Sequence, residues 1–220
     1  MSWLTPALAA HVPALARRLE IECRVDRPVV ALTFDDGPHD DGTPAVLERL
    51  AASGARATFF LVGEQVERRP GVARAIVEAG HEIGLHGHRH TLLLRRRVRE
   101  LADDLDRATA VIAEATGVEP KLYRPPYGVF SSGALAHVRA RGLRPLLWSA
   151  WGRDWQRTAT PARIARRVTR NLARGDVVLL HDSDAYSSAD SWRRTAAALP
   201  SVIDAVAAIG VEADAVTQST

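Results

Sequence analysis

Short apolar runs alternate along the chain with longer segments in which apolar residues recur every three or four positions. The short runs are rich in β-branched and aromatic residues and predict buried strands, whereas the longer segments predict amphipathic helices. Strands are expected over 29–34, 56–62, 81–85, 121–124, 143–149 and 176–181, with a weak final strand near Val211. Helices are expected over 43–53, 70–79, 97–116, 131–141, 161–173 and 192–208.

Prolines and glycines mark the expected ends of these elements. Gly37-Pro38 should stop the first strand, because proline supplies no N–H to a strand ladder. Thr43 is suited to cap the helix that follows, with Pro44 at its first position. Glycines that follow the last residue of an expected helix stop it. These glycines are Gly54, Gly80 and Gly117.

Strands that alternate with helices indicate an α/β protein with a parallel sheet. There are about seven such units, without an internal repeat or a linker-like stretch. The last strand could lie beside the first, and we therefore expect an irregular (β/α) barrel rather than an open doubly wound sheet. We assign residues 1–27 to a helical lead-in, with an amphipathic helix over 1–19, and residues 28–220 to one catalytic domain.

The composition of the 220 residues narrows the class of protein. It is 46% hydrophobic and 25% charged, which is typical of a globular domain, and the formal charge is +3. The dense basic run 95–97 with Arg99 lacks interleaved aromatics, so we expect a solvated helix start and no nucleic-acid partner. No apolar run is long enough to span a membrane. Cys23 is the only cysteine, which excludes an intrachain disulfide.

Residues 1–19 lack a cationic segment followed by an apolar core, the pattern of a secretory signal. The expected location is therefore the cytoplasm, or outside the cell if the printed chain has lost a leader. The oligomeric state is left open by the sequence.

Polar side chains recur at the predicted carboxyl ends of the strands. In a barrel or an open parallel sheet, functional residues gather at this edge. The residues that follow the strands are Asp35-Asp36, His86-His88-His90, 124–128, 148–155 and His181-Asp182. Histidine, carboxylate, arginine and tryptophan at five separate strand ends predict one functional site.

Three of these histidines lie within five residues of the chain. His86 and His90 have the separation that places two imidazoles on one face of a helical turn, whereas His88 would point away. Two imidazoles with one carboxylate form a metal site with open positions, suited to zinc or another divalent first-row ion. Such a site fits an iron oxygenase or a metal-assisted hydrolase. The aspartate of the pair that does not bind the metal can act as a base, and His181 can act as an acid, which favours hydrolysis.

Five segments of the chain, in the same order, resemble the motifs of the polysaccharide deacetylase (NodB-homology) family, also called carbohydrate esterase family four. The resemblance covers about residues 28–220 and implies the NodB-type fold, an irregular (β/α) barrel. The segments are 33–38 (TFDDGP), 86–90 (HGHRH), 124–128 (RPPYG), 153–155 (RDW) and 179–181 (LLH).

In the first three motifs, the resemblance implies a metal site and a base beside it. Asp36, His86 and His90 would hold the metal. Asp35 would be the catalytic base, and Arg124 would hold it in place.

The later motifs imply the remaining catalytic groups. The backbone N–H of Tyr127 would help to stabilise the oxyanion. His181 would be the general acid, tuned by Asp154.

Three side chains of these motifs would line the substrate groove with Tyr127. Leu179 would line the acetyl pocket and Trp155 would form a wall. Trp151 stands where the family has an aspartate, and we expect it to stack on sugar. Gly87 stands where the family has a serine or threonine whose hydroxyl steadies the loop. These two departures bear on the shape of the groove and on the support of the loop.

The resemblance implies a metal-dependent hydrolase that removes N-linked acetyl groups from a glycan or an amino sugar. The metal would be zinc, with cobalt, nickel or manganese as alternatives. The expected partner is an acetylated carbohydrate. Other interpretations are an O-acetyl esterase or a cyclic-amide hydrolase of the same superfamily and, more distantly, a sugar-binding module without activity.

Overall fold

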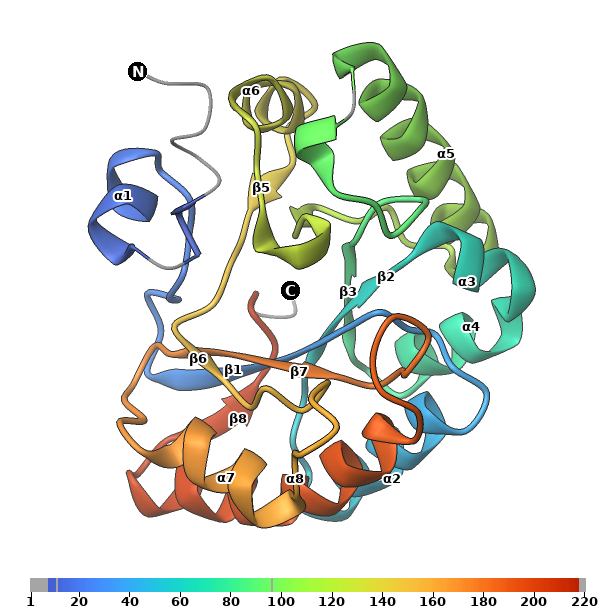
Figure 1. The fold of residues 1–220 in the computed structure, drawn as a ribbon. Helices are drawn as coiled ribbons and strands as arrows, with labels where there is room; N and C mark the ends of the chain where they lie inside the picture. The colour runs from blue at the N-terminus through green and yellow to red at the C-terminus, as the bar shows by residue number, and fades with distance from the viewer. Residues whose placement is uncertain (1–7, 11, 96, 218–220) are drawn as a thin grey trace.

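The computed structural model describes residues 8–10, 12–95 and 97–217. In this part of the chain, eight parallel strands form one curled sheet with the order β5-β4-β3-β2-β1-β7-β6, and β8 also pairs with β1 (Figure 1). The irregular α/β barrel expected from the sequence is confirmed. The strands are β1 (Val29–Asp35), β2 (Thr58–Leu61), β3 (Glu82–Leu85), β4 (Leu122–Tyr123), β5 (Arg144–Pro145), β6 (Ala150–Trp151), β7 (Val177–His181) and β8 (Glu212–Asp214).

The helices lie on the outside of the curled sheet, with α2, α7 and α8 along one side and α3, α4 and α5 along another (Figure 1). None of the described helices is long and apolar enough to cross a membrane. The helices are α1 (Pro13–Arg18), α2 (Gly42–Ser53), α3 (Gly63–Arg68), α4 (Pro70–Glu78), α5 (Val98–Thr116), α6 (Ser132–Ala140), α7 (Pro161–Thr169) and α8 (Ser191–Ala208), with short 3₁₀ turns η2 (Leu93–Arg95) and η3 (Pro126–Gly128).

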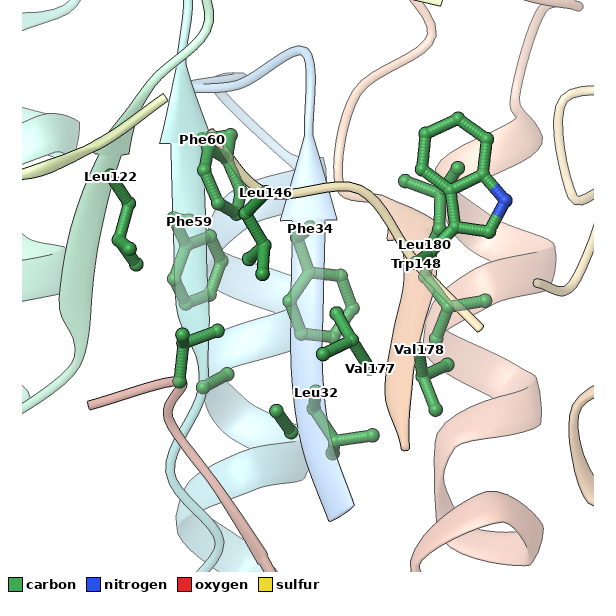
Figure 2. Packing of buried hydrophobic residues seen from close by; sticks show 14 of the residues in the cluster. Leu32, Phe34, Phe59, Phe60, Leu122, Leu146, Trp148, Val177, Val178 and Leu180 are labelled. Carbon is green, nitrogen blue, oxygen red and sulfur yellow. The ribbon is translucent and has the colours of Figure 1, made fainter. Parts of the chain in front are cut away.

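Strand β1 is the centre of the core, and all seven of its residues are buried. Strands of a parallel sheet covered on both faces read as continuous apolar runs, which explains the apolar sequence of 29–34. Phe34 of β1 stacks on Phe59 of β2 with ring centroids 5.1 Å apart. Figure 2 shows these two rings with Leu146 and Trp148 among the buried residues of the same cluster. The core thus sits beneath the edge at which β1 delivers its carboxylates.

Residues 22–25 bridge the open side of the sheet. The N–H of Glu22 donates to the carbonyl of Pro145 (3.0 Å), and the N–H of Leu147 donates to the carbonyl of Glu22 (2.7 Å). The N–H of Val25 donates to the carbonyl of Gly175, two residues before β7 (2.9 Å). This short segment therefore connects the β5 side of the barrel with the β7 side.

The single strand expected over 143–149 is wrong. Only Arg144–Pro145 pairs with β4, and a separate two-residue strand, Ala150–Trp151, pairs with β7. Between them the chain crosses from one side of the barrel to the other, and Leu147 bonds to residue 22 instead of a neighbouring strand. Pro145 has no N–H to donate to a longer ladder.

Two expectations about helices need correction, and one further helix was missed. Helix α1 covers only Pro13–Arg18 of the expected 1–19, of which residues 1–7 and 11 lie outside the described residues. Thr43 does not cap α2, because the helix begins at Gly42 and the Thr43 hydroxyl instead donates to Asp182. Helix α3 was not expected at all.

The basic run before α5 behaves as a solvated helix start where it is described. Arg97 is the N-cap residue of α5, and its N–H donates to the Glu100 carboxylate (3.2 Å). Arg99 is exposed on the first turn, and Arg96 lies outside the described residues.

Candidate active site

A cavity of about 270 Å³ opens at the carboxyl ends of the strands. Nine of the predicted site residues line it, and the other two, Arg124 and Asp154, are buried behind its wall with no exposed surface. The lining residues are Asp35, Asp36, His86, His90, Tyr127, Gly128, Trp148, Trp151, Trp155, Leu179, His181, Tyr186 and Ser187.

The aspartate pair is placed by the end of β1. Asp35 is the last residue of the strand and lies in register with His181 of β7. Asp36 follows with a φ of 79°, in the left-handed region that non-glycine residues rarely adopt. Side chains of consecutive strand residues point to opposite faces, so this turn is what lets both carboxylates face the same cavity.

Asp35 is held by Arg124, as the sequence predicts. The guanidinium Nη1 donates to Asp35 Oδ1 (2.6 Å) and to the Thr33 hydroxyl (2.8 Å), and Nη2 donates to the Leu147 carbonyl (2.9 Å). The guanidinium also lies 4.1 Å from the centroid of the Phe60 ring. Burial lowers the pKa of Arg124, and Asp35 opposes that shift. Asp35 is therefore a buried carboxylate with a fixed position and a matched positive charge.

Asp36, His86 and His90 form the one group of metal-ligand type found among the described residues, with ligand atoms within 4.8 Å of one another. Asp36 Oδ1 lies 3.5 Å from His86 Nε2 and 3.3 Å from His90 Nε2. This oxygen is buried and has no hydrogen-bond partner in the described part of the chain. A buried carboxylate oxygen left unpaired is costly, and a cation at this point would remove that cost. The residues therefore fit a divalent metal.

The protonation of these groups suits metal ligation. Burial alone would raise the pKa of Asp36, but the contact with His86 and the charges of His181 and His90 lower it to about 2. Burial lowers the pKa of His90 to about 4, so the ring is neutral near pH 7. His86 Nδ1 lies 2.8 Å from the carbonyl of Arg124, which can only accept, so the proton sits on Nδ1 and Nε2 is free to ligate.

The loop that carries His86 and His90 is not a helical turn, contrary to the spacing argument. Gly87 adopts a φ of 87°, and this sharp turn brings the His86 and His90 rings to a centroid distance of 5.4 Å. His88 is buried and, as expected, makes no contact with the aspartate pair; its Nε2 lies 3.8 Å from Glu67.

The support for this loop comes from α3 and α5 rather than from a side chain at position 87. The first N–H groups of α3, those of Gly63 and Glu64, donate to the carbonyls of Gly87 and His88 (both 2.9 Å). Asp104 of α5 accepts from the N–H of His88 (2.6 Å). The loop is therefore held by hydrogen bonds from α3 and to α5, even though Gly87 has no side chain to support it.

His181 is paired with Asp154, as the sequence predicts. Its Nδ1 lies 3.0 Å from Asp154 Oδ1, and its backbone N–H donates to Asp154 Oδ2 (2.7 Å). The Thr195 hydroxyl donates to the same oxygen (2.8 Å). Burial alone would lower the pKa of His181, but Asp154, with Asp36 and Asp35, raises it to about 10. The imidazole thus carries a proton near pH 7.

An aromatic wall closes one side of the cavity. Trp151 stacks on Trp148 (5.7 Å between centroids) and leans on Trp155 (5.5 Å), and Trp155 meets the His181 ring edge-on (5.3 Å). The guanidinium of Arg153 lies 4.4 Å from the centroid of Trp151. Trp151 therefore extends a tryptophan row that begins beside His181. Leu179 is buried in the lining.

Tyr127 stands at the mouth of the cavity, with 59% of its surface exposed. Its φ of 61° turns the chain between Pro126 and Gly128. Gly128 also has a positive φ, and a side chain there would collide with the Trp148 ring. The tryptophan row and the tyrosine turn are thus packed directly together.

Tyr186, which also lines the cavity, lies with its ring against His90. The two rings are nearly parallel, at an angle of 12° and a centroid distance of 4.2 Å. Burial and the hydrogen bond to Glu64 raise the pKa of Tyr186, so the phenol stays protonated. Its loop position carries no periodic signal that could have revealed this contact.

Asp182 is a second residue whose position sequence reasoning missed. It lies in the loop after β7, as expected, but it is fully buried behind the first motif and accepts from the Thr43 hydroxyl. A side chain at Gly37 would collide with the Asp182 carboxylate. Burial raises the pKa of Asp182 to about 7. This carboxyl therefore packs against the turn that carries Asp36.

Comparison with known proteins agrees with this geometry. The family model described as polysaccharide deacetylase matches residues 23–146. The chain is 36% identical to a peptidoglycan-N-acetylglucosamine deacetylase of Bacillus cereus over 70% of this chain and 72% of that one. It is 34% identical to a chitooligosaccharide deacetylase of Azorhizobium caulinodans over 82% of this chain and 89% of that one.

A solved structure, that of the Bc1960 peptidoglycan N-acetylglucosamine deacetylase with a bound N-hydroxybenzamide, has the same fold. It superposes with a TM-score of 0.84 and 26% identity, covering 92% of this chain and 93% of that one. Some relatives are longer: the chain spans 36% of the length of the PgdA deacetylase of Listeria monocytogenes.

Proposed function

Because this chain belongs to the polysaccharide deacetylase family, we propose that it is a metal-dependent hydrolase that releases acetate from N-acetylated sugar residues. One observation supports this above the others. A single cavity joins a carboxylate held by a buried arginine, a metal-ligand set and a protonated histidine. These are the base, the metal site and the acid that amide hydrolysis requires.

Asp36, His86 and His90 would hold the metal. A divalent ion held there would act as a Lewis acid, which would make water a stronger nucleophile near pH 7 and polarise the acetyl carbonyl. Two imidazoles and one carboxylate suit zinc, with cobalt, nickel or manganese as alternatives.

Asp35 accepts the proton of the attacking water. Its Oδ1 is engaged by Arg124 at 2.6 Å, which fixes the carboxyl plane and leaves Oδ2 toward the cavity side, 3.8 Å from His86 Nε2. General-base catalysis of this kind contributes about 10²- to 10⁴-fold.

His181 donates a proton to the departing amine, which is a poor leaving group when it is unprotonated. Asp154 binds Nδ1, so the free Nε2–H is the one directed to the cavity, 4.0 Å from Asp36 Oδ2. The backbone N–H of Tyr127 would donate to the oxyanion, a contribution of about 3 kcal/mol for one well-placed donor.

The substrate class follows from the relatives and from the shape of the cavity. We propose an N-acetylglucosamine polymer or oligomer, as in peptidoglycan or chitooligosaccharide. The tryptophan row and the exposed ring of Tyr127 present apolar faces on which sugar rings stack, with Leu179 beside the acetyl methyl group.

An acetate-release assay tests the proposal. The protein, loaded with zinc or cobalt, is incubated with N-acetylglucosamine oligomers, peptidoglycan fragments and matched O-acetylated sugars. We expect acetate from the N-acetylated substrates. Release of acetate only from O-acetylated sugars would refute amide hydrolysis. Oligosaccharide binding without acetate release would refute the proposal that the protein is an enzyme.

The variant Asp35→Asn tests the base. We expect it to retain bound metal and to lose at least about 100-fold in kcat. Asp106→Asn is the matched control, because Asp106 is an exposed carboxylate paired with Arg141 outside the cavity. Near wild-type turnover by metal-loaded Asp35→Asn would contradict the assignment.

A further inference from the structure

The two ligand histidines are held in different ways. His86 donates from Nδ1 to the carbonyl of Arg124, which sets the plane of its ring. His90 Nδ1 is buried and meets no hydrogen-bond acceptor in the described part of the chain. Metal-bound histidines almost always use the second nitrogen in such a bond, and the bond orients the ligand. Something else must therefore orient His90.

Aromatic contacts fill that role. Tyr186 stacks on His90 almost face to face, with 4.2 Å between centroids and an angle of 12°. Tyr127 meets the same imidazole edge-on, at 4.6 Å and 62°. Because these two tyrosines come from loops on different sides of the cavity, together they restrict both the tilt and the position of the ring.

The stacked ring is itself fixed through its hydroxyl. Tyr186 donates to Glu64 Oε1 (2.5 Å) and accepts from Gln65 Nε2 (2.9 Å). Gln65 Oε1 in turn accepts from Arg69 (2.6 Å), whose Nε donates to Asp40 (2.7 Å). A ring held at its far end by two hydrogen bonds cannot swing away from the imidazole without breaking both.

Helix α3 connects both parts of this arrangement. Its first two N–H groups bind the carbonyls of Gly87 and His88, in the loop that carries His90. The side chains of Glu64 and Gln65, at the same end of α3, bind Tyr186. The first turn of α3 thus holds both the backbone of the histidine loop and the Tyr186 ring that stacks on His90.

We propose that Tyr186 is a positioning residue that orients the metal ligand His90 by ring stacking, in place of the missing hydrogen bond at Nδ1. This inference rests on the metal site of the proposed function. Its action is on the strength and geometry of metal binding, and it does not require Tyr186 to touch the sugar.

Metal binding by three proteins tests the proposal: wild type, Tyr186→Leu and Tyr186→Phe. Zinc affinity is measured by competition with a chelating indicator, and the visible absorption of bound Co²⁺ reports ligand geometry. We expect Tyr186→Leu to bind zinc about 10- to 100-fold more weakly, the usual effect of removing a group that orients a ligand. Its Co²⁺ spectrum should also change. Tyr186→Phe keeps the stacked ring but loses the two hydrogen bonds that fix it, so its zinc affinity should lie between those of wild type and Tyr186→Leu.

Trp192→Leu is the matched control. Trp192 packs beside His39, a histidine outside the metal site, with centroids 5.9 Å apart. This variant removes a larger buried ring but should keep wild-type zinc affinity and spectrum. Circular dichroism and unfolding of the metal-free proteins show whether each variant folds.

Three outcomes would overturn parts of the argument in distinguishable ways. Wild-type zinc affinity and spectrum in Tyr186→Leu would refute the positioning role. An unchanged metal site with a raised KM for the oligosaccharide would instead make Tyr186 a sugar-binding residue. If the wild-type protein itself bound no divalent metal, the proposed function would fail along with this inference.

Discussion

Removing the guanidinium of Arg124 is the perturbation whose cost the structure defines best. Arg124 has no exposed surface, and it donates to Asp35, Thr33 and the Leu147 carbonyl. In Arg124→Met, the Asp35 carboxylate would remain buried without its positive partner, a change that typically costs about 3–5 kcal/mol. For a chain of this size, each kcal/mol lowers Tm by about 2–4 °C, so a fall of about 6–20 °C is expected.

A double-mutant cycle shows whether the uncompensated charge is the cause. Urea unfolding is measured in chelator for wild type, Arg124→Met, Asp35→Asn and the double variant, because a metal bound to the adjacent Asp36 would add its own stabilisation. We expect the double variant to be more stable than the sum of the two single effects predicts, by about 1–3 kcal/mol.

The control for this cycle is Arg141→Met. Arg141 pairs with Asp106 on the surface, where an ion pair contributes at most about 1 kcal/mol. Additive effects of the Arg124 and Asp35 substitutions, within about 0.5 kcal/mol, would refute the charge argument. So would an Arg124 variant no less stable than the Arg141 variant.

Three other changes have expected outcomes. Gly128→Ala should lower the unfolding free energy by about 1–3 kcal/mol, because φ is 67° and the new Cβ would lie 2.9 Å from Trp148 Cζ3. Gly142→Ala is the control, because Gly142 has a similar φ but open space around the new Cβ. An equal loss of stability in the two variants, measured by urea unfolding, would contradict the collision with Trp148. Burial, with Arg56, lowers the pKa of His81 to about 4. Between this value and the ordinary pKa of histidine, the unfolded chain binds a proton at His81 that the folded chain does not bind. The free energy of unfolding present above pH 6.5 therefore falls by about 3 kcal/mol as the pH falls towards 4. Between pH 7 and pH 4.5, His81→Gln should lose less unfolding free energy than wild type, and equal losses would count against this assignment. Zinc at 100 times its Kd should stabilise the protein by about 2.7 kcal/mol and raise Tm by about 5–10 °C, reversed by chelator; a Tm that ignores both would argue against a folded-state metal site.

The elements with strong periodic patterns were predictable. The apolar run before Asp35 gave the central strand, and β1 ends where Gly37-Pro38 requires. The 19-residue helix α5 ends at Gly117, which adopts the left-handed conformation expected of it. These features depend on nearest neighbours in the chain, and so the sequence contains them directly.

The errors fall where distant contacts replace local preference. Threonine favours helix N-caps, but the Thr43 hydroxyl instead donates to the buried carboxyl of Asp182, which lies far away in the sequence. The six-residue helix α3 is too short to show a period and depends on contacts with the histidine loop. The 143–149 segment crosses the barrel because residue 22 pairs with it.

The candidate site shows the same division. Motif residues and their order predicted that the aspartate pair, His86, His90, Arg124 and His181 belong to one site, and the structure brings these residues together. The spacing argument for the histidines reached the right pair through the wrong geometry, since Gly87 and not a helical turn brings the rings together. Nothing in the local sequence indicated that the Tyr186 ring stacks on His90.

The sequence by itself determined the alternation of strands and helices, the family and the chemical groups available at the strand ends. These depend on residue type, on short-range periodicity and on the order of motifs. Only the tertiary structure decided how those groups are held: the turn at Gly87 brings His86 and His90 together, and a tyrosine 96 positions after His90 stacks on its ring. The physical reason is that buried charges and ligand rings need partners in three dimensions, and the fold supplies them from segments that the linear chain keeps far apart.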